Sequence, residues 1–287
     1  MRTTALHEDF GVEVHGVDLK EATLEAVYPA LRALFEDHSL LLFRNQDLGE
    51  ACHRVLAELF GPLEDLTGAA PGEPPPRPIV SNRRPDGSLA AEGELQLLNL
   101  QSNFIWHTDS TFLATPSISN ILTAYRVPSR GGETELVSTR AGWRRLPAAL
   151  KTRARDKVFL HRYAHSRRQV DETLAEQEMF TKWPDTPWRS TWRNPMNGLE
   201  SLYIAAHAYG VRGLSQVEGQ ALLDELTAAV TGQEAIYAHS WRVGDVLIWD
   251  QRATLHRGRP WPYEEERTLA SLVSSARESD GLASVRP

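Results

Sequence analysis

The sequence has very little cysteine, no long apolar run and no excess of basic residues. Its one cysteine, Cys52, rules out a disulfide within the chain, which is typical of a reducing compartment. Apolar runs such as residues 40–43 are too short to cross a bilayer, and the first residues lack the apolar stretch of a signal peptide. Lysine and arginine number 31 against 38 acidic residues, a formal charge of -7. We therefore expect a cytoplasmic protein without a membrane or nucleic-acid partner.

What is present is an ordinary globular composition, with 41% hydrophobic and 24% charged residues over 287 positions. This length would allow roughly two domains, but β-rich chains of this size often form one. No interior linker divides the chain, so we expect a single domain over residues 1–287. Within it we expect a helical N-terminal layer over about 1–65, a lid loop over 67–100 and a strand-rich core over about 101–275.

Apolar residues at helical spacing predict helices over residues 23–37, 50–60, 140–156 and 216–230. Residues 38–44 are predicted to form a buried strand. Residues 67–85 contain six prolines and two glycines, a composition that excludes a helix or a central strand. Residues 183–197 are expected to form an irregular insert. Further short strands are predicted over residues 118–127, 134–138, 202–206, 234–241, 246–249 and 268–274.

The segment around His107 carries the first chemical signal. If it is extended, His107 and Asp109 project to the same face, because strand side chains alternate with a period of two. A histidine and a carboxylate on one face form a two-point chelate. His256, far downstream, would complete two nitrogens and one oxygen on one side of a metal. That is the ligand geometry of non-haem Fe(II) oxygenases, in which open positions remain for co-substrate and O2.

Arg267 adds an anion-binding group to this constellation. It begins a strand-like run, and an arginine that points into a barrel is costly unless it meets an anion. Its planar guanidinium suits a carboxylate bound in bidentate fashion. The alternatives are a chance His-X-Asp without a metal, and an Arg267 paired at the surface with one of the acidic residues at 264–266.

With these residues, the sequence resembles the taurine dioxygenase / 2,4-dichlorophenoxyacetate dioxygenase family of Fe(II)- and 2-oxoglutarate-dependent enzymes. The family pattern runs Trp-His-X-Asp, then Gly-Gly-Asp/Glu-Thr, then Trp-Asp-Asn-Arg leading to His, and finally Arg. The matching residues here are 106–109, 131–134, 249–252, His256 and Arg267. Gln251 departs from the usual asparagine, outside the ligand set. The resemblance extends from about residue 16 to about residue 274.

The resemblance implies a mainly β chain with flanking helices, built on a double-stranded β-helix of the jelly-roll type. It implies that His107, Asp109 and His256 ligate Fe(II), and that Arg267 and Thr134 bind the distal carboxylate of 2-oxoglutarate. The reaction would decarboxylate 2-oxoglutarate to succinate and CO2, with O2 as oxidant, and hydroxylate a substrate C–H bond. Relatives that halogenate replace the metal carboxylate, so Asp109 favours hydroxylation. Relatives are often dimers or tetramers, which suggests a homo-oligomer.

The primary substrate is less well defined by the sequence. Sulfonate-using relatives carry a second arginine four residues after the 2-oxoglutarate arginine, where this chain has Ser271. His207 lies in a stretch that resembles the phenoxyacetate branch, which favours a small carboxylate such as an aryloxyalkanoate. Asn103 and His207 are candidate substrate contacts, although either can be a satisfied structural residue. Arg83, Arg84 and Arg193 could also meet a substrate carboxylate, although surface arginines are usually just solvated.

Several alternatives stay open at this stage. Within the family, they are a taurine or alkylsulfonate dioxygenase and a natural-product tailoring oxygenase. Outside it, they are a 2-oxoglutarate-binding sensor without turnover, a zinc hydrolase with the same three ligands, and a structural domain. A sensor would release only background CO2 from 2-oxoglutarate, and a hydrolase would turn over without O2.

Overall fold

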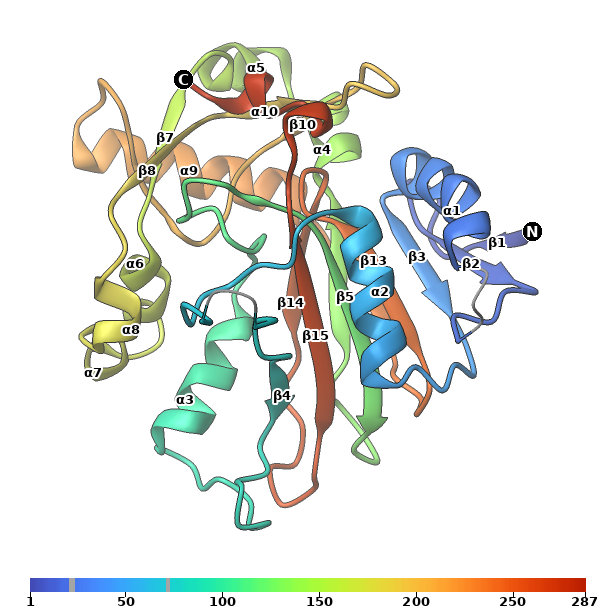
Figure 1. Cartoon of the computed structure of the whole chain (residues 1–287). Helices are drawn as coiled ribbons and strands as arrows, with labels where there is room; N and C mark the ends of the chain where they lie inside the picture. Colours follow the sequence, from blue (N-terminus) through green and yellow to red (C-terminus); the bar gives the residue numbers. More distant parts are fainter. Residues whose placement is uncertain (21–23, 71–72) are drawn as a thin grey trace.

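The computed structural model describes residues 1–20, 24–70 and 73–287. Two sheets face each other at its centre, and helices cover the outer sides (Figure 1). In spatial order the large sheet consists of β1 (Arg2–Ala5), β2 (Val12–His15), β3 (Leu40–Phe43), β13 (Val246–Asp250), β5 (Ser117–Arg126), β15 (Thr268–Ser275) and β4 (Ile79–Ser81). The small sheet consists of β12 (Tyr237–His239), β6 (Thr134–Ser138) and β14 (Thr254–Gly258).

The strand β3 shows why the large sheet needs apolar residues on both faces. Leu40 and Leu42 point toward the small sheet and pack in one cluster with Leu136 of β6. Leu41 and Phe43 point the other way, into a second cluster under two helices. This alternation explains an uninterrupted apolar strand. The covering helices are α1 (Leu24–His38) and α2 (Glu50–Phe60).

Three of the four predicted helices are confirmed within the described residues. They are α1, α2 and α9 (Gln216–Val230); Thr23, the first residue of the predicted 23–37 helix, lies outside the described residues. The predicted helix over 140–156 is wrong, because the chain forms two helices there. They are α4 (Thr139–Arg145) and α5 (Ala148–Ala154). The break falls at Pro147, which disfavours a helical conformation at Leu146, where ψ is 138°.

The strand predictions also need correction. The predicted strand over 202–206 ends at its first residue, in β10 (Glu200–Leu202), and the one over 234–241 is shortened to β12 behind η2 (Gln233–Ala235). The insert over 183–197 is not irregular throughout, because it holds β8 (Thr186–Arg189) and β9 (Thr191–Arg193). Pro187 is compatible with β8 because this strand lies at an edge of the sheet β11-β7-β8. Its partners are β7 (Val158–His161) and β11 (Ala208–Val211).

The segment over 67–100 contains an edge strand and the start of a helix. Among the described residues, its strand β4 pairs with β15 alone and therefore lies at the edge of the sheet. The helix is α3 (Leu95–Gln101), followed by η1 (Ser102–Phe104). The region before residue 65 contributes β1, β2 and β3 to the sheet as well as its two helices. The alternating Val12–His15 segment carried this signal.

The remaining short helices form two groups. Figure 1 shows α6 (Tyr163–Arg168), α7 (Glu172–Ala175) and α8 (Glu178–Thr181) on the left, and η3 (Glu278–Asp280) leads into α10 (Leu282–Val285) near the C-terminus. Among the described residues, no helix is both long and apolar enough for a bilayer crossing. The prediction of a mainly β chain with flanking helices and a jelly-roll core is confirmed.

Candidate metal and co-substrate site

Two histidines far apart in the sequence are fastened together through their backbones. The amide of His107 donates to the carbonyl of His256 at 3.0 Å, and the amide of His256 donates back at 2.8 Å. This isolated antiparallel bridge continues the small sheet beyond β14. The two imidazole rings consequently lie side by side, with centroids 4.1 Å apart.

Asp109 brings a carboxylate to the same point from a turn after His107. Its Oδ1 lies 3.6 Å from Nε2 of His107 and 3.8 Å from Nε2 of His256. One ligand atom from each of the three residues lies within 4.8 Å of the others. The other oxygen, Oδ2, accepts hydrogen bonds from Asn120 at 2.9 Å and from the Gln251 amide. One carboxylate oxygen is therefore fixed by the protein while the other faces the imidazoles.

The protonation states suit a divalent metal. Burial lowers the pKa of His107 and lowers that of His256 to about 3, so both imidazoles are neutral near pH 7. Although burial opposes ionisation of Asp109, His256 and His107 and the hydrogen bonds from Asn120 and Gln251 hold its pKa below the usual value. Nδ1 of His107 lies 2.8 Å from the Ile105 carbonyl and donates to it, which leaves the Nε2 lone pair facing Asp109. Two neutral imidazoles and one carboxylate fit Fe(II).

Gln251, noted for its departure from the family pattern, orients the carboxylate. Its Oε1 accepts from the Thr108 hydroxyl at 2.6 Å and from the Asp109 amide at 3.1 Å, while its Nε2 donates to Asp109. The residue lies outside the three-residue set but holds one of its members in place. Partners of this kind fix the orientation of a metal ligand and tune its affinity.

The three side chains line a cavity of about 280 Å³. Arg267, Thr134 and Ser271 line it as well. Thr134, at the start of β6, is buried and accepts a hydrogen bond from the Trp241 indole at 3.0 Å. Ser271 stands where sulfonate-using relatives carry their second arginine, and it lines the cavity. Its hydroxyl donates to Asn120 at 2.8 Å.

Arg267 is a buried cation without a carboxylate partner among the described residues. Its Nε donates to the Gly132 carbonyl at 3.1 Å, and its guanidinium lies 5.2 Å from the centre of the Trp261 ring. Burial lowers the pKa of Arg267 to about 10, against a smaller opposing effect of Glu133. A side chain at Gly132 would begin 3.0 Å from the guanidinium, at a backbone φ of 71° that favours glycine. The Gly-Gly motif thus lets the backbone approach this arginine.

The two candidate substrate contacts also line the cavity. Asn103 does so from η1. His207 is buried, and its Nδ1 lies 2.8 Å from the Ser166 hydroxyl. Burial lowers the pKa of His207 well below its usual value, so its imidazole is neutral. Trp249 packs against His256 with ring centroids 4.8 Å apart, whereas Trp106 lies under Arg257 outside the cavity.

The prediction that Arg83, Arg84 or Arg193 meets a substrate carboxylate is wrong, because none of them lines this cavity. Arg83 pairs with Glu266 at 2.9 Å and Arg84 pairs with Glu94. Arg193 borders a different hollow of the surface. The cavity instead contains residues that the sequence analysis missed. They are Glu64, Ser110, Phe112, Tyr163 and Arg167. These residues lie outside the four family motifs, and the short helix α6 that carries two of them was not predicted.

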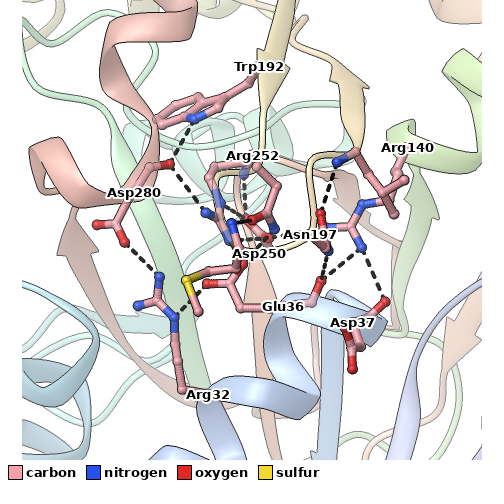
Figure 2. Close-up of polar contacts among 12 residues, drawn as sticks. Arg32, Glu36, Asp37, Arg140, Trp192, Asn197, Asp250, Arg252 and Asp280 are labelled. Atoms are coloured by element: carbon pink, nitrogen blue, oxygen red, sulfur yellow. Dashed lines mark hydrogen bonds and ion pairs between the residues drawn. The ribbon is translucent and has the colours of Figure 1, made fainter.

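The Trp-Asp-Gln-Arg motif also serves a region away from the cavity. Asp250 and Arg252 point into a buried ion cluster with Arg32, Glu36 and Asp280, here called the back cluster (Figure 2). Arg252 contacts Glu36 at 2.6 Å and Asp250 at 2.9 Å. Arg32 contacts Glu36 and Asp280, each at 2.6 Å. The back cluster ties α1 to β13 and to the C-terminal segment.

Comparison with known proteins decides the family. The family model described as Taurine catabolism dioxygenase TauD, TfdA family matches residues 2–273. The chain belongs to this family. The predicted class of enzyme, an Fe(II)- and 2-oxoglutarate-dependent dioxygenase that uses O2, is confirmed with it.

Similar family members act on phenoxy acids. The chain is 32% identical over 269 residues to the alpha-ketoglutarate-dependent 2,4-dichlorophenoxyacetate dioxygenase of Cupriavidus pinatubonensis, covering 92% of this chain and 94% of that protein. It is 31% identical over 272 residues to the (S)-phenoxypropionate/alpha-ketoglutarate-dioxygenase of Sphingobium herbicidovorans, covering 92% and 91%. The crystal structure of AAD-2 in complex with Mn(II) and N-oxalylglycine superimposes with a TM-score of 0.89 at 27% identity, covering 97% of this chain and all of that one (100%).

Proposed function

We propose that this dioxygenase hydroxylates a C–H bond of a small organic acid, with His107, Asp109 and His256 as the ligands of Fe(II). The observation that carries the proposal is the convergence of two Nε2 atoms and one Oδ1 atom within 4.8 Å, at the wall of a cavity that also holds Arg267. When bound, the iron with O2 couples decarboxylation of 2-oxoglutarate to substrate oxidation, one oxygen atom going into succinate and the other into the substrate.

Arg267 and Thr134 are the proposed 2-oxoglutarate residues. The buried guanidinium of Arg267 has donors left over beyond the one given to Gly132, and the Thr134 hydroxyl has a hydrogen free while it accepts from Trp241. Both can therefore donate to one distal carboxylate. A charged hydrogen bond in a water-poor site fixes the co-substrate and sets its keto-acid end toward the iron ligands.

An aryloxyalkanoate-like carboxylate is the proposed substrate. The relatives named above act on phenoxy acids, and Ser271 leaves no arginine at the position used by sulfonate-using relatives. Hydroxylation beside an ether oxygen gives a hemiacetal, which collapses to a phenol and an aldehyde. Asn103 and His207 are the proposed substrate contacts, because both line the cavity.

We also propose that residues 67–100 act as a lid of a single domain that spans the chain. Pro78, Val80 and Leu100 line the cavity from this segment. Closure would exclude water and limit oxidation without substrate. The strand β4 fixes one part of the segment to β15, and residues 71–72 of the segment lie outside the described residues.

The cellular setting is part of the proposal. We place the enzyme in the cytoplasm, on a small-molecule substrate and without a nucleic-acid or membrane partner. A single cysteine and a charge of -7 support this setting. Family analogy supports a homo-oligomer.

The test is release of CO2 from labelled 2-oxoglutarate with Fe(II) and ascorbate, together with succinate production across a panel of aryloxyalkanoates. The wild type should show substrate-stimulated release, and Asp109→Ala should fall to background because it loses a metal ligand. Asp185→Ala, at a surface ion pair with Arg162, is the matched control. Background release by the wild type would favour the sensor, and turnover without O2 would favour a hydrolase. Full activity in Asp109→Ala would reject the ligand assignment.

A further inference from the structure

Arg167 is a second buried arginine at the wall of the cavity. It lies on α6, one turn after Tyr163, and is only 9% exposed. The residue lines the same cavity as the iron ligands, and its charge lowers the pKa of His107 after the effects of burial, Asp109 and Ile105. Arg167 therefore lies near the reaction centre, on a different element from Arg267.

The contacts of Arg167 leave its charge uncompensated. Its Nη1 donates to the Ser166 hydroxyl at 3.1 Å and its Nη2 to the Tyr163 hydroxyl at 3.0 Å, both neutral groups. Its guanidinium lies over the rings of Tyr163, at 4.5 Å, and Phe180, at 5.0 Å. Its Nε is buried without a hydrogen-bond partner. No carboxylate of the described residues makes an ion pair with Arg167.

Such an arrangement is costly in the free protein. A guanidinium does not release its proton, and a buried charge normally requires an opposite charge and hydrogen bonds to all its donors. Arg252, in the back cluster, meets this requirement with two carboxylates. Glu64, which also lines the cavity, is hydrogen bonded to Ser110, and burial raises the pKa of Glu64 to about 7. The described residues therefore provide no counter-ion for Arg167, so its charge is available to an anionic ligand.

The surroundings of Arg167 describe the rest of the ligand. Phe112 stacks on Tyr163 with centroids 3.7 Å apart and planes 7° from parallel. His207 meets both rings edge-on, at 5.1 Å and 5.5 Å. These flat apolar surfaces suit an aromatic or alkyl body. The cavity of about 280 Å³ must hold 2-oxoglutarate as well, so the body must be small.

We propose that Arg167 is the residue that binds the substrate's anionic group, a carboxylate held by Nε and Nη2 while the wall of Phe112, Tyr163 and His207 holds its apolar body. The inference rests on the proposed function, since the acid bound there is the substrate to be oxidised. It assigns the two unpaired arginines of the cavity to two different carboxylates, that of 2-oxoglutarate at Arg267 and that of the substrate at Arg167.

The test is calorimetric binding to protein loaded with Mn(II) and N-oxalylglycine, which occupies the 2-oxoglutarate position without turnover. The probes are phenoxyacetate and its neutral analogue phenoxyacetamide. The wild type should bind the acid at least about tenfold more tightly than the amide. Arg167→Met, which keeps length and apolar contact, should lose about 10- to 100-fold in affinity for the acid and bind the amide within about threefold of the wild type.

The neighbouring Arg168 provides the matched control. It is half-exposed and pairs with Glu172 one turn on, at 2.9 Å, so Arg168→Met should bind both probes as the wild type does. Arg167→Lys keeps the charge but not the planar pair of donors, and should bind the acid with intermediate affinity. Melting curves of all variants establish that each is folded.

Three outcomes would overturn the assignment. They are equal binding of the acid by the wild type and Arg167→Met, binding of the amide by the wild type as tight as that of the acid, and tighter binding of 2-phenylethanesulfonate than of 3-phenylpropionate. Because the assay involves no turnover, it separates the two proposals. Acid binding that depends on Arg167 without succinate production would reject the hydroxylation and keep the anion site, whereas turnover that is indifferent to Arg167 would do the reverse.

Discussion

The back cluster and the cavity handle buried arginines in opposite ways. In the back cluster, Arg252 touches two carboxylates within 2.9 Å, and every member has an ionic partner. In the cavity, Arg167 and Arg267 donate only to hydroxyls and a backbone carbonyl. Figure 2 shows Arg252 and Arg32 among the acidic residues Glu36, Asp250 and Asp280. The difference teaches which charges serve the fold and which are available to a ligand.

Two glutamates repeat the contrast. Although burial opposes it, Arg252 and Arg32 hold the pKa of Glu36 below its usual value. Glu64, with which no arginine of the described residues pairs, has its pKa raised to about 7 by burial. Glu36 is therefore ionised in the back cluster, whereas Glu64 in the cavity is largely protonated below about pH 7. The sign of each shift depends on whether a cation lies in reach.

The largest effect is expected from breaking the back cluster. Arg252→Met leaves the buried Asp250 with only the longer contact to Arg140 at 3.8 Å, and leaves Glu36 with Arg32 alone. This loss should lower the free energy of unfolding by about 3–5 kcal/mol. Denaturant titration of the purified protein measures this. Arg167→Met in the same titration should change stability by less than about 1 kcal/mol, because it removes a charge that no carboxylate balances. Equal losses in the two variants would end the distinction between the two regions.

The next effect concerns the co-substrate. Arg267→Met should raise the 2-oxoglutarate concentration needed for half-maximal succinate production by about 10- to 100-fold, since a charged bidentate contact is lost. Its melting temperature should stay at or above that of the wild type. Arg259→Met, at the cavity rim and paired with Glu135 at 3.6 Å, should change the same constant by less than about threefold. An unchanged 2-oxoglutarate dependence in Arg267→Met would reject its role.

The smallest effect is a pH dependence. The folded pKa of Glu64 is raised from 4.5 to about 7, so between these values the unfolded chain ionises while the folded one stays protonated. Its contribution to stability is thus full below pH 4.5 and is lost as the pH rises to about 7. Glu64→Gln should remove this loss, on the order of 1 kcal/mol because the side chain is only partly shielded from solvent.

The measurement for Glu64 is denaturant unfolding of the metal-free protein at pH 5 and pH 8. Wild type and Glu64→Gln should differ in their change of stability between the two values. Glu58→Gln, on the exposed side of α2, should parallel the wild type. Parallel profiles for all three proteins would show that burial does not perturb Glu64.

Site residues that belong to sequence motifs could be predicted, whereas residues that only the fold brings together could not. Four motifs at family spacing pointed to the residues that now line one cavity, His107, Asp109, His256, Thr134 and Arg267. Arg167 carried no such signal. Its neighbours Phe112 and His207 come from other segments, and only tertiary packing decides whether an arginine meets a carboxylate.

Two errors in the predicted secondary structure could have been avoided from the sequence. Pro147 was present inside the predicted helix over 140–156, and its effect on the preceding residue accounts for the break. The alternating residues Val12–His15 formed a strand in a region expected to be helical. The end of β10 could not have been predicted in this way, because nothing in residues 202–206 marks where its pairing with β9 ends.

The mutual backbone bonds between His107 and His256 have a consequence for metal exchange. These bonds join backbone atoms and do not depend on a bound ion. Both imidazoles should therefore keep their positions in the metal-free protein. Metal binding then requires no rearrangement of these two histidines, because they already lie side by side. On the proposed ligand assignment, a protein that has lost its metal should therefore bind the metal again without refolding.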